Sequence, residues 1–268
     1  MPYLSPVLNV MIAAARKAGR ALIRDFGELE QLQVSLKGPA DFVTVADERT
    51  EKILIEELSR ARPGYCFLVE ESGAIDGPDK SHRFIIDPLD GTTNFLHGIP
   101  QFAISIALER DGVLVSGLVF NPVSDELFVA ERNHGAFLNE RRLRVSARKQ
   151  LKDALIGTGI PFLGREGHEK FLAELSGVMA ATSGVRRVGA AALDLAWVAA
   201  GRLDGFWERG LSPWDIAAGI LMVREAAGIV TDPDGGTAML TSGAIVAGNE
   251  PLQPQLLKLL KGAGAPSP

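Results

Sequence analysis

One short segment places two acidic residues at the end of an apolar strand, and this constrains the fold more than any other feature. Residues 84–86 are apolar and predict a short buried strand, which Asp87 and Asp90 follow directly. Burying two carboxylates is unfavourable unless positive charge lies between them. The next Lys or Arg after Asp87 is Arg110, so no neighbouring side chain in the sequence supplies that charge. A metal cation is the natural counter-charge, and oxygen ligands favour Mg²⁺, then Mn²⁺ or Ca²⁺.

The composition is that of an ordinary globular chain, with 46% hydrophobic and 23% charged residues among 268. The formal net charge of −5 argues against a nucleic-acid partner, because neutralising phosphates requires clustered Lys and Arg. We expect no signal peptide and no membrane segment, since no apolar run approaches the roughly 20 residues of a membrane span. The single cysteine, Cys66, fits a reducing compartment, so we expect a cytoplasmic protein.

Hydrophobic periodicity divides the chain into two halves of different character. In the first half we predict helices at 5–26 and 47–60, strands at 32–36, 65–69 and 84–86, a loop at 37–40, and an antiparallel meander at 102–109, 113–121 and 126–131. In the second half we predict strands near 154–158, 203–208, 229–231 and 244–247, and helices near 166–181, 189–200, 213–227 and 251–262. This pattern predicts an α+β subdomain at 1–143 and an α/β layered subdomain at 144–268.

The acids at the strand ends suggest a site for metal ions and phosphate. If the strands ending at Glu70 and Asp87 are neighbours, both carboxylates emerge at the same end of the sheet, and Asp90 and the Leu89 carbonyl turn toward them. Such oxygens are reasonable ligands for two Mg²⁺ ions, which are a usual means of polarising a phosphate and activating water. Gly91 precedes a predicted helix start, where free N–H groups bind phosphate. The alternative is that this segment is only a turn and a helix cap.

Two further acids have simple interpretations when each is taken alone. Asp215 lies in the first turn of a helix that begins with the N-cap Ser212, so it could merely complement the helix dipole. Asp41 and Asp47 could likewise be a loop acid and the N-terminal acid of a helix.

Taken together, four segments in order resemble the inositol monophosphatase family of the Mg²⁺-dependent, lithium-sensitive sugar phosphatases. These segments are 84–95, 214–219, 41–47 and 70–72, and the resemblance extends from residue 5 to about residue 260. It implies an αβαβα sandwich, with a mixed antiparallel sheet in the first half and an α/β second half. It also implies a homodimer that hydrolyses a small polyol phosphate, most notably myo-inositol 1-phosphate.

The resemblance implies a role for each matching position. Glu70, Asp87 and the Leu89 carbonyl would hold one Mg²⁺, while Asp87, Asp90 and Asp215 would hold another. A third, weaker Mg²⁺ would lie near Glu70 through waters, Mn²⁺ would substitute, and Li⁺ would inhibit. Thr92, supported by Asp47 and Glu70, would orient or deprotonate the attacking water. The substrate would contact Asp90, Asp215, the Gly91 and Thr92 N–H groups, and Gly189, Ala191 and Glu208.

One position departs from the family pattern and leaves the substrate open. The family often carries Ser or Thr where this chain has Ala190, so a hydroxyl is lost beside the alcohol pocket. The alternative substrates are fructose 1,6-bisphosphate, histidinol phosphate and a 3′-phosphonucleotide. Two non-enzymatic functions also remain open: a regulatory binding protein on this fold, and a structural cation-binding domain.

Overall fold

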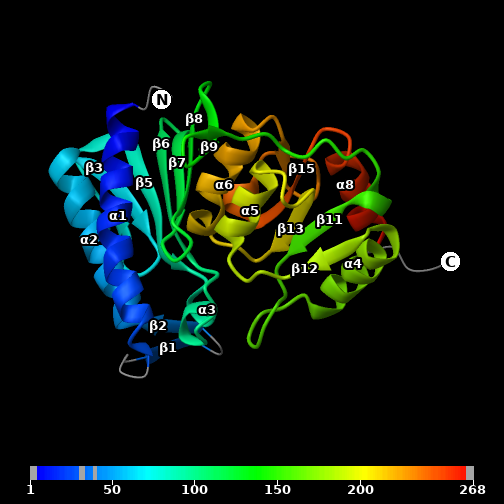
Figure 1. Cartoon of the computed structure of the whole chain (residues 1–268), viewed down its shortest axis with the longest axis horizontal. Helices are drawn as coiled ribbons and strands as arrows, with labels where there is room; N and C mark the ends of the chain where they lie inside the picture. The colour runs from blue at the N-terminus through cyan, green and yellow to red at the C-terminus, as the bar shows by residue number, and fades with distance from the viewer. Residues whose placement is uncertain (1–4, 30–33, 39–40, 264–268) are drawn as a thin grey trace.

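The computed structural model describes residues 5–29, 34–38 and 41–263 (Figure 1). The helices are α1 (Pro6–Phe26), α2 (Val45–Ala61), α3 (Thr92–Leu96), the 3₁₀ turn η2 (Leu151–Asp153), α4 (His168–Ala181), α5 (Ala191–Ala199), α6 (Pro213–Glu225), α7 (Met239–Ser242) and α8 (Gln253–Gly262). The strands are β1 (Val34–Gly38), β2 (Asp41–Thr44), β3 (Tyr65–Val69), β4 (Gly73–Ile75), β5 (Asp79–Asp90), β6 (Ala103–Arg110), β7 (Val113–Asn121), β8 (Glu126–Glu131), β9 (Gly135–Leu138), β10 (Arg141–Arg142), β11 (Leu155–Thr158), β12 (Gly184–Arg186), β13 (Gly205–Arg209), β14 (Ile229–Thr231) and β15 (Ala244–Gly248).

These elements form five layers, which confirms the predicted αβαβα arrangement (Figure 1). Helices α1 and α2 cover one face of an eight-stranded sheet, and α5 and α6 lie between that sheet and a five-stranded sheet. Helices α4 and α8 cover the outer face of the smaller sheet. Each helix therefore buries an apolar stripe against a sheet, and α5 and α6 are buried on both sides.

The two large sheets mix parallel and antiparallel strands, whereas β1 and β2 form a separate antiparallel pair. The larger has the order β10-β9-β8-β7-β6-β5-β3-β4, in which only β3 and β5 are parallel neighbours, and the meander β6-β7-β8 is confirmed. The smaller has the order β12-β11-β13-β15-β14. The predicted division between 1–143 and 144–268 falls between β10 and β11, and it stays a prediction.

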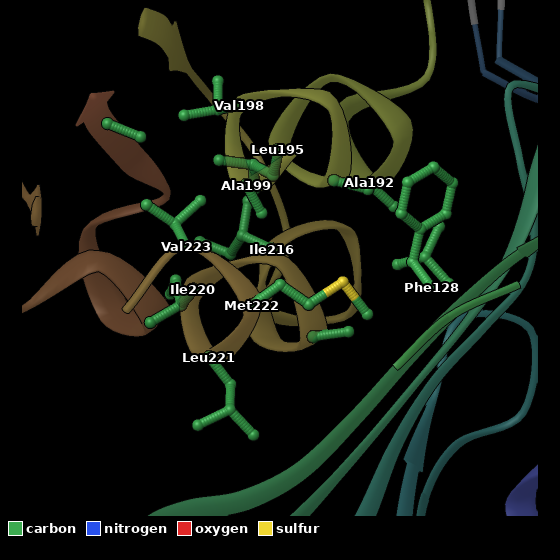
Figure 2. Close-up of a cluster of buried hydrophobic side chains, with 14 of the residues drawn as sticks. Phe128, Ala192, Leu195, Val198, Ala199, Ile216, Ile220, Leu221, Met222 and Val223 are labelled. Carbon is green, nitrogen blue, oxygen red and sulfur yellow. The ribbon is translucent and has the colours of Figure 1, made fainter. Parts of the chain in front are cut away.

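Apolar side chains of α5 and α6 form the centre of the molecule. Leu195, Ile216 and Met222 are fully buried, and Phe128 of β8 reaches the same cluster (Figure 2). Neither helix is a one-sided amphipathic helix, because each faces a sheet on both sides. None of the helices in the described part of the chain combines the length and apolar character needed to cross a membrane.

The helix starts follow the local signals in the sequence, whereas some strands do not. The Ser5 hydroxyl accepts a hydrogen bond from the Leu8 N–H at 3.3 Å, which caps α1 as expected for a Ser-Pro start. The predicted strand 84–86 is wrong in length: β5 extends back to Asp79, which pairs with Tyr65 of β3, and β6 supplies partners from His82 to Asp90. The predicted loop 37–40 is wrong at its first two residues, which belong to β1; its last two lie outside the described residues.

The short strands β4, β9, β10 and β12 and the four-residue helix α7 were not predicted. They have two to four residues each, too few to establish a period of 2 or 3.6. The conformation of the four strands depends on their partners in the sheets more than on their own sequences.

Candidate active site

The first two acids of the site lie side by side because β3 and β5 are parallel neighbours. Val69 pairs with Ile86 at the end of β3, so Glu70 and Asp87 occupy adjacent positions at the same sheet end. The Glu70 N–H donates to the Ile86 carbonyl at 3.3 Å, which extends the pairing one step beyond the strand. The predicted adjacency of the two strands is therefore confirmed.

An irregularity in β5 brings Asp90 to the same place. In a regular strand, residues three apart point to opposite faces. Here Asp87 pairs with Ser105 and Asp90 pairs with Ala103, so three steps along β5 match two steps along β6. Pro88 has no N–H to donate to the ladder, which explains why the extra residue is accommodated at this point. Because of this bulge, the two acids return to one side of the sheet.

Asp215 reaches the site from the second half of the chain. It is the third residue of α6, as the helix-dipole alternative requires, and its carboxylate also accepts from the Ser212 N–H at 2.7 Å, which completes a capping box. The same carboxylate also lies within hydrogen-bonding reach of Asp87. Asp215 therefore caps its helix and takes part in the acidic cluster.

Burial and mutual repulsion strongly disfavour the charged form of Asp87, Asp90 and Asp215. Burial raises the pKa of Asp87 well above its usual range, and the charges of Glu70, Asp90 and Asp215 raise it further. Burial likewise raises the pKa of Asp90 to about 8 and that of Asp215 to about 7, with neighbouring acids adding to both shifts. A cation is therefore needed for all three aspartates to be ionised together at neutral pH.

The donor set fits a hard divalent cation. Among the described residues, no three Asp, Glu, His or Cys side chains take the arrangement of a ready-made metal site. The fit rests instead on chemistry: the cluster of Glu70, Asp87, Asp90 and Asp215 supplies carboxylate oxygens alone, and Asp87 contacts its acidic neighbours directly.

Thr92 and Asp47 form a hydrogen-bonded pair beside the acids. The Thr92 hydroxyl lies 3.2 Å from Asp47 Oδ1 and 3.1 Å from the Leu89 carbonyl oxygen, and it can donate to either. Asp47 is completely buried, and its other oxygen accepts from the Thr44 N–H at 2.8 Å. Burial raises the pKa of Asp47 to about 6, although its bonds to Thr44 oppose the shift. The predicted association of Asp47 with Thr92 is present in the structure.

Gly91 provides the backbone geometry that starts α3 beside the acids. Its φ of 96° lies in the left-handed region, which favours glycine. An added Cβ would also lie 3.0 Å from the Gln101 carbonyl oxygen and 3.3 Å from Ala190 Cβ. α3 then follows directly, held by Phe95, whose ring contacts Phe102 at 5.0 Å between centroids. The helix start predicted after Gly91 is therefore confirmed.

Helix α5 is capped from a distance by one of the acids. Its own N-cap residue, Ala190, has no side-chain oxygen, and the Ala192 N–H donates to Asp90 Oδ2 at 2.7 Å instead. The N-terminal end of a helix stabilises a negative charge. Asp90 therefore supplies the capping acceptor that Ala190 lacks.

The predicted metal and substrate residues border one cavity of about 580 Å³. They are Glu70, Asp87, Leu89, Asp90, Gly91, Thr92, Gly189, Ala191, Glu208 and Asp215, and Asp47 lies behind Thr92. Glu208 extends from β13, where burial raises its pKa to about 8 and the charges of Asp215 and Asp90 add to the shift. Arg165 and Arg187 oppose that shift, so the cavity is acidic at one end and has basic groups nearby.

Three further residues of the site were missed by sequence reasoning. Thr44 holds Asp47 in place, and Asn94 donates to the carbonyls of Gln101 and Val188, at 2.7 and 2.9 Å, which joins α3 to the segment before Gly189. Asp194 borders the cavity from α5. An acid inside the apolar segment 191–199 was a signal that could have identified Asp194; the partners of Asn94 are distant in sequence and gave none.

The layered fold, the buried acids at adjacent strand ends and the helix start beside them define a metal-dependent phosphatase of the sugar-phosphatase type. The sequence profile of the Inositol monophosphatase family matches residues 3–265. The chain belongs to the inositol monophosphatase family, which is a family of phosphatases.

Individual relatives agree with this membership. The "Inositol-1-monophosphatase" of Mesorhizobium japonicum is 63% identical over 257 residues, which cover 96% of this chain and 97% of the relative. The "Nus factor SuhB" of Pseudomonas aeruginosa is 46% identical and covers 92% of each chain. The crystal structure of "extragenic suppressor protein suhB" from Bartonella henselae superposes with a TM-score of 0.94 at 61% identity, covering 96% of this chain and 99% of that one.

Proposed function

We propose that this chain hydrolyses myo-inositol 1-phosphate, or a similar small polyol phosphate, to the free alcohol and inorganic phosphate. The observation that carries the proposal is that the acidic cluster and Glu208 border the same cavity, which offers a place for metal ions, phosphate and alcohol together. The relatives named inositol-1-monophosphatase, at 63% and 60% identity, support the choice of substrate.

Mg²⁺ is the proposed cation, held by Glu70, Asp87, the Leu89 carbonyl, Asp90 and Asp215 in two or three sites. Bound cations supply Lewis-acid stabilisation of the phosphate charge and lower the pKa of bound water. Mn²⁺ has the same preference for oxygen ligands and should substitute. The family resemblance predicts inhibition by Li⁺; an inhibition curve at fixed Mg²⁺ tests this, and full activity at high Li⁺ would contradict it.

The chain's own residues position the reactants. The Thr92 hydroxyl, held beside the Asp47 carboxylate at 3.2 Å, is placed to orient the attacking water and pass its proton toward Asp47. With its pKa raised to about 6, Asp47 is a better proton acceptor than an ordinary aspartate. The Gly91 and Thr92 N–H groups at the start of α3 hold the phosphate, and Glu208 accepts hydrogen bonds from hydroxyls of the alcohol.

Phosphate release from a panel of substrates tests this proposal directly. We would measure Mg²⁺-dependent release from inositol 1-phosphate, fructose 1,6-bisphosphate, histidinol phosphate and 3′-phosphoadenosine 5′-phosphate. We expect the highest kcat/KM for inositol 1-phosphate. A preference for another substrate would change the proposed substrate but leave the proposed metal-assisted hydrolysis in place. No phosphate release from any of the four, with Mg²⁺ bound, would contradict a phosphatase function.

A second function is suggested by the relatives named Nus factor SuhB, at 46% identity over 250 residues. We propose that the chain also has a regulatory protein partner, independent of turnover. Capture of the same partner by wild type and by Asp87→Asn would support this role, and loss of capture in that variant would tie binding to the active site. The net charge of −5 makes a protein a better candidate for direct contact than RNA.

We further propose a cytoplasmic homodimer, as the family resemblance and the single Cys66 suggest. Light scattering at several protein concentrations tests the oligomeric state. A constant monomer mass would contradict it.

A further inference from the structure

Asp194 is a buried acid that the proposed reaction does not use. It lies on α5 among apolar neighbours, with only 1% of its surface exposed. Its Oδ1 atom is buried and has no hydrogen-bond partner within the described part of the structure. A buried carboxylate oxygen without a partner is unfavourable for folding and calls for an explanation.

The position of Asp194 links it to the alcohol end of the cavity. It borders the same cavity as Glu208, and Glu208 is the charged group that acts on it most strongly. Burial raises the pKa of Asp194 well above its usual range, the charges of Glu208 and Asp90 add to the shift, and Arg187 opposes it. Because both acids border one cavity, a single bound molecule can contact both of them.

Two glycines make room for these two acids. Gly157 and Gly159 are two residues apart along and just beyond β11, so they share a face, and Gly157 pairs with Phe206 of the neighbouring strand. A Cβ at Gly157 would lie 3.1 Å from Asp194 Oδ1, and a Cβ at Gly159 would lie 1.8 Å from Glu208 Oε1. Because neither glycine has a side chain, both carboxylates have space beside β11 that any larger residue would fill.

A helix-capping role does not explain Asp194. An acid can stabilise a helix N-terminus from an exposed position, so this role would not require Asp194 to be buried. Moreover, the Ala192 N–H in the first turn of α5 donates to Asp90 rather than to Asp194. Capping therefore leaves Asp194 Oδ1 without a partner among the described residues, at a position that borders the cavity.

We propose that Asp194 is a specificity-determining residue, which accepts a hydrogen bond from one hydroxyl of the alcohol while Glu208 accepts from another. The inference rests on the proposed function, because it assigns a second contact within the same polyol site. It predicts that substrates bearing several hydroxyls depend on Asp194, whereas phosphate esters without hydroxyls do not.

The test compares inositol 1-phosphate with phenyl phosphate, which has no hydroxyl to donate. We expect Asp194→Ala to lower the ratio of kcat/KM for inositol 1-phosphate to that for phenyl phosphate by about ten-fold or more, because a site that binds a hydroxyl loses affinity when the acceptor is removed. Asp194→Asn keeps a carbonyl acceptor of the same shape, so we expect it to restore most of the ratio.

A buried acid elsewhere provides the control. Asp25 of α1 is 5% exposed, and its Oδ2 atom also lacks a partner among the described residues. Asp25→Ala should lower the melting temperature and leave the ratio unchanged, because Asp25 does not border the cavity.

The outcomes separate the inference from the proposed function. Suppose that the wild type prefers inositol 1-phosphate and that Asp194→Ala lowers kcat/KM equally for both substrates. Asp194 would then be merely structural, and the inference alone would be overturned. A wild type that hydrolyses phenyl phosphate but not inositol 1-phosphate would overturn the proposed function, and the inference with it.

Discussion

Replacing Gly159 with alanine should damage alcohol recognition while leaving the acidic cluster in place. The added Cβ would lie 1.8 Å from Glu208 Oε1, whereas an ordinary contact begins at 3.4 Å. The Glu208 carboxylate must therefore retreat by about 1.6 Å, since neither group can compress. The Gly159 backbone does not require the left-handed region, so alanine adds no backbone strain.

The size of the effect follows from the hydrogen bonds that Glu208 would lose. Leaving a buried hydroxyl without its hydrogen-bond acceptor costs about 1–3 kcal/mol. At about 1.4 kcal/mol for each factor of ten, one such bond corresponds to a roughly ten- to hundred-fold change in kcat/KM. A shift of about 1 Å in a group that positions the substrate can have a similar effect.

The assay is steady-state hydrolysis of inositol 1-phosphate and phenyl phosphate, with Mg²⁺ affinity measured by calorimetry. We expect Gly159→Ala to lower kcat/KM for inositol 1-phosphate about ten- to hundred-fold, with a smaller change for phenyl phosphate and for Mg²⁺ affinity. Gly262→Ala is the matched control, because a Cβ at Gly262 meets nothing within 4 Å. Unchanged turnover of inositol 1-phosphate in Gly159→Ala would refute the placement of Glu208 at the alcohol.

Three more predictions concern the acidic end of the cavity. Asp87→Asn should abolish turnover and weaken Mg²⁺ binding by calorimetry, and near-normal activity at saturating Mg²⁺ would refute the ligand assignment. Thr92→Ala should lower kcat by about 10²–10⁴-fold, more than it raises KM, because its role lies in the transition state; the reverse pattern would make it a binding residue only. Without divalent cations the melting temperature should fall as pH rises from about 5 to 8, because Asp215 and Asp90, with pKa values raised to about 7 and 8, hold protons in the folded state that the unfolded state releases. Added Mg²⁺ should reduce this loss, and a melting temperature that rises over the same interval without cations would contradict the burial of these acids.

Much of the acidic end could be predicted from the sequence because its signals are local. Asp87 and Asp90 follow an apolar strand directly, and Ser212 and Pro213 mark the start of the helix that carries Asp215. The adjacency of Glu70 and Asp87 needed one assumption, that two strands are neighbours, and the structure confirms it. The bulge that aims Asp87 and Asp90 to one side depends on pairing with β6, which the segment itself does not reveal.

The sequence by itself determined where the chain can place acids, caps and apolar strands, because these depend on residues within a few positions of one another. Only the tertiary structure decided which distant groups complete the site. Asp90 meets the Ala192 N–H across 102 residues, and Asn94 meets the Val188 carbonyl across 94. Such contacts depend on how α5 is held between two sheets, and the packing of whole layers, not any local pattern, sets that position.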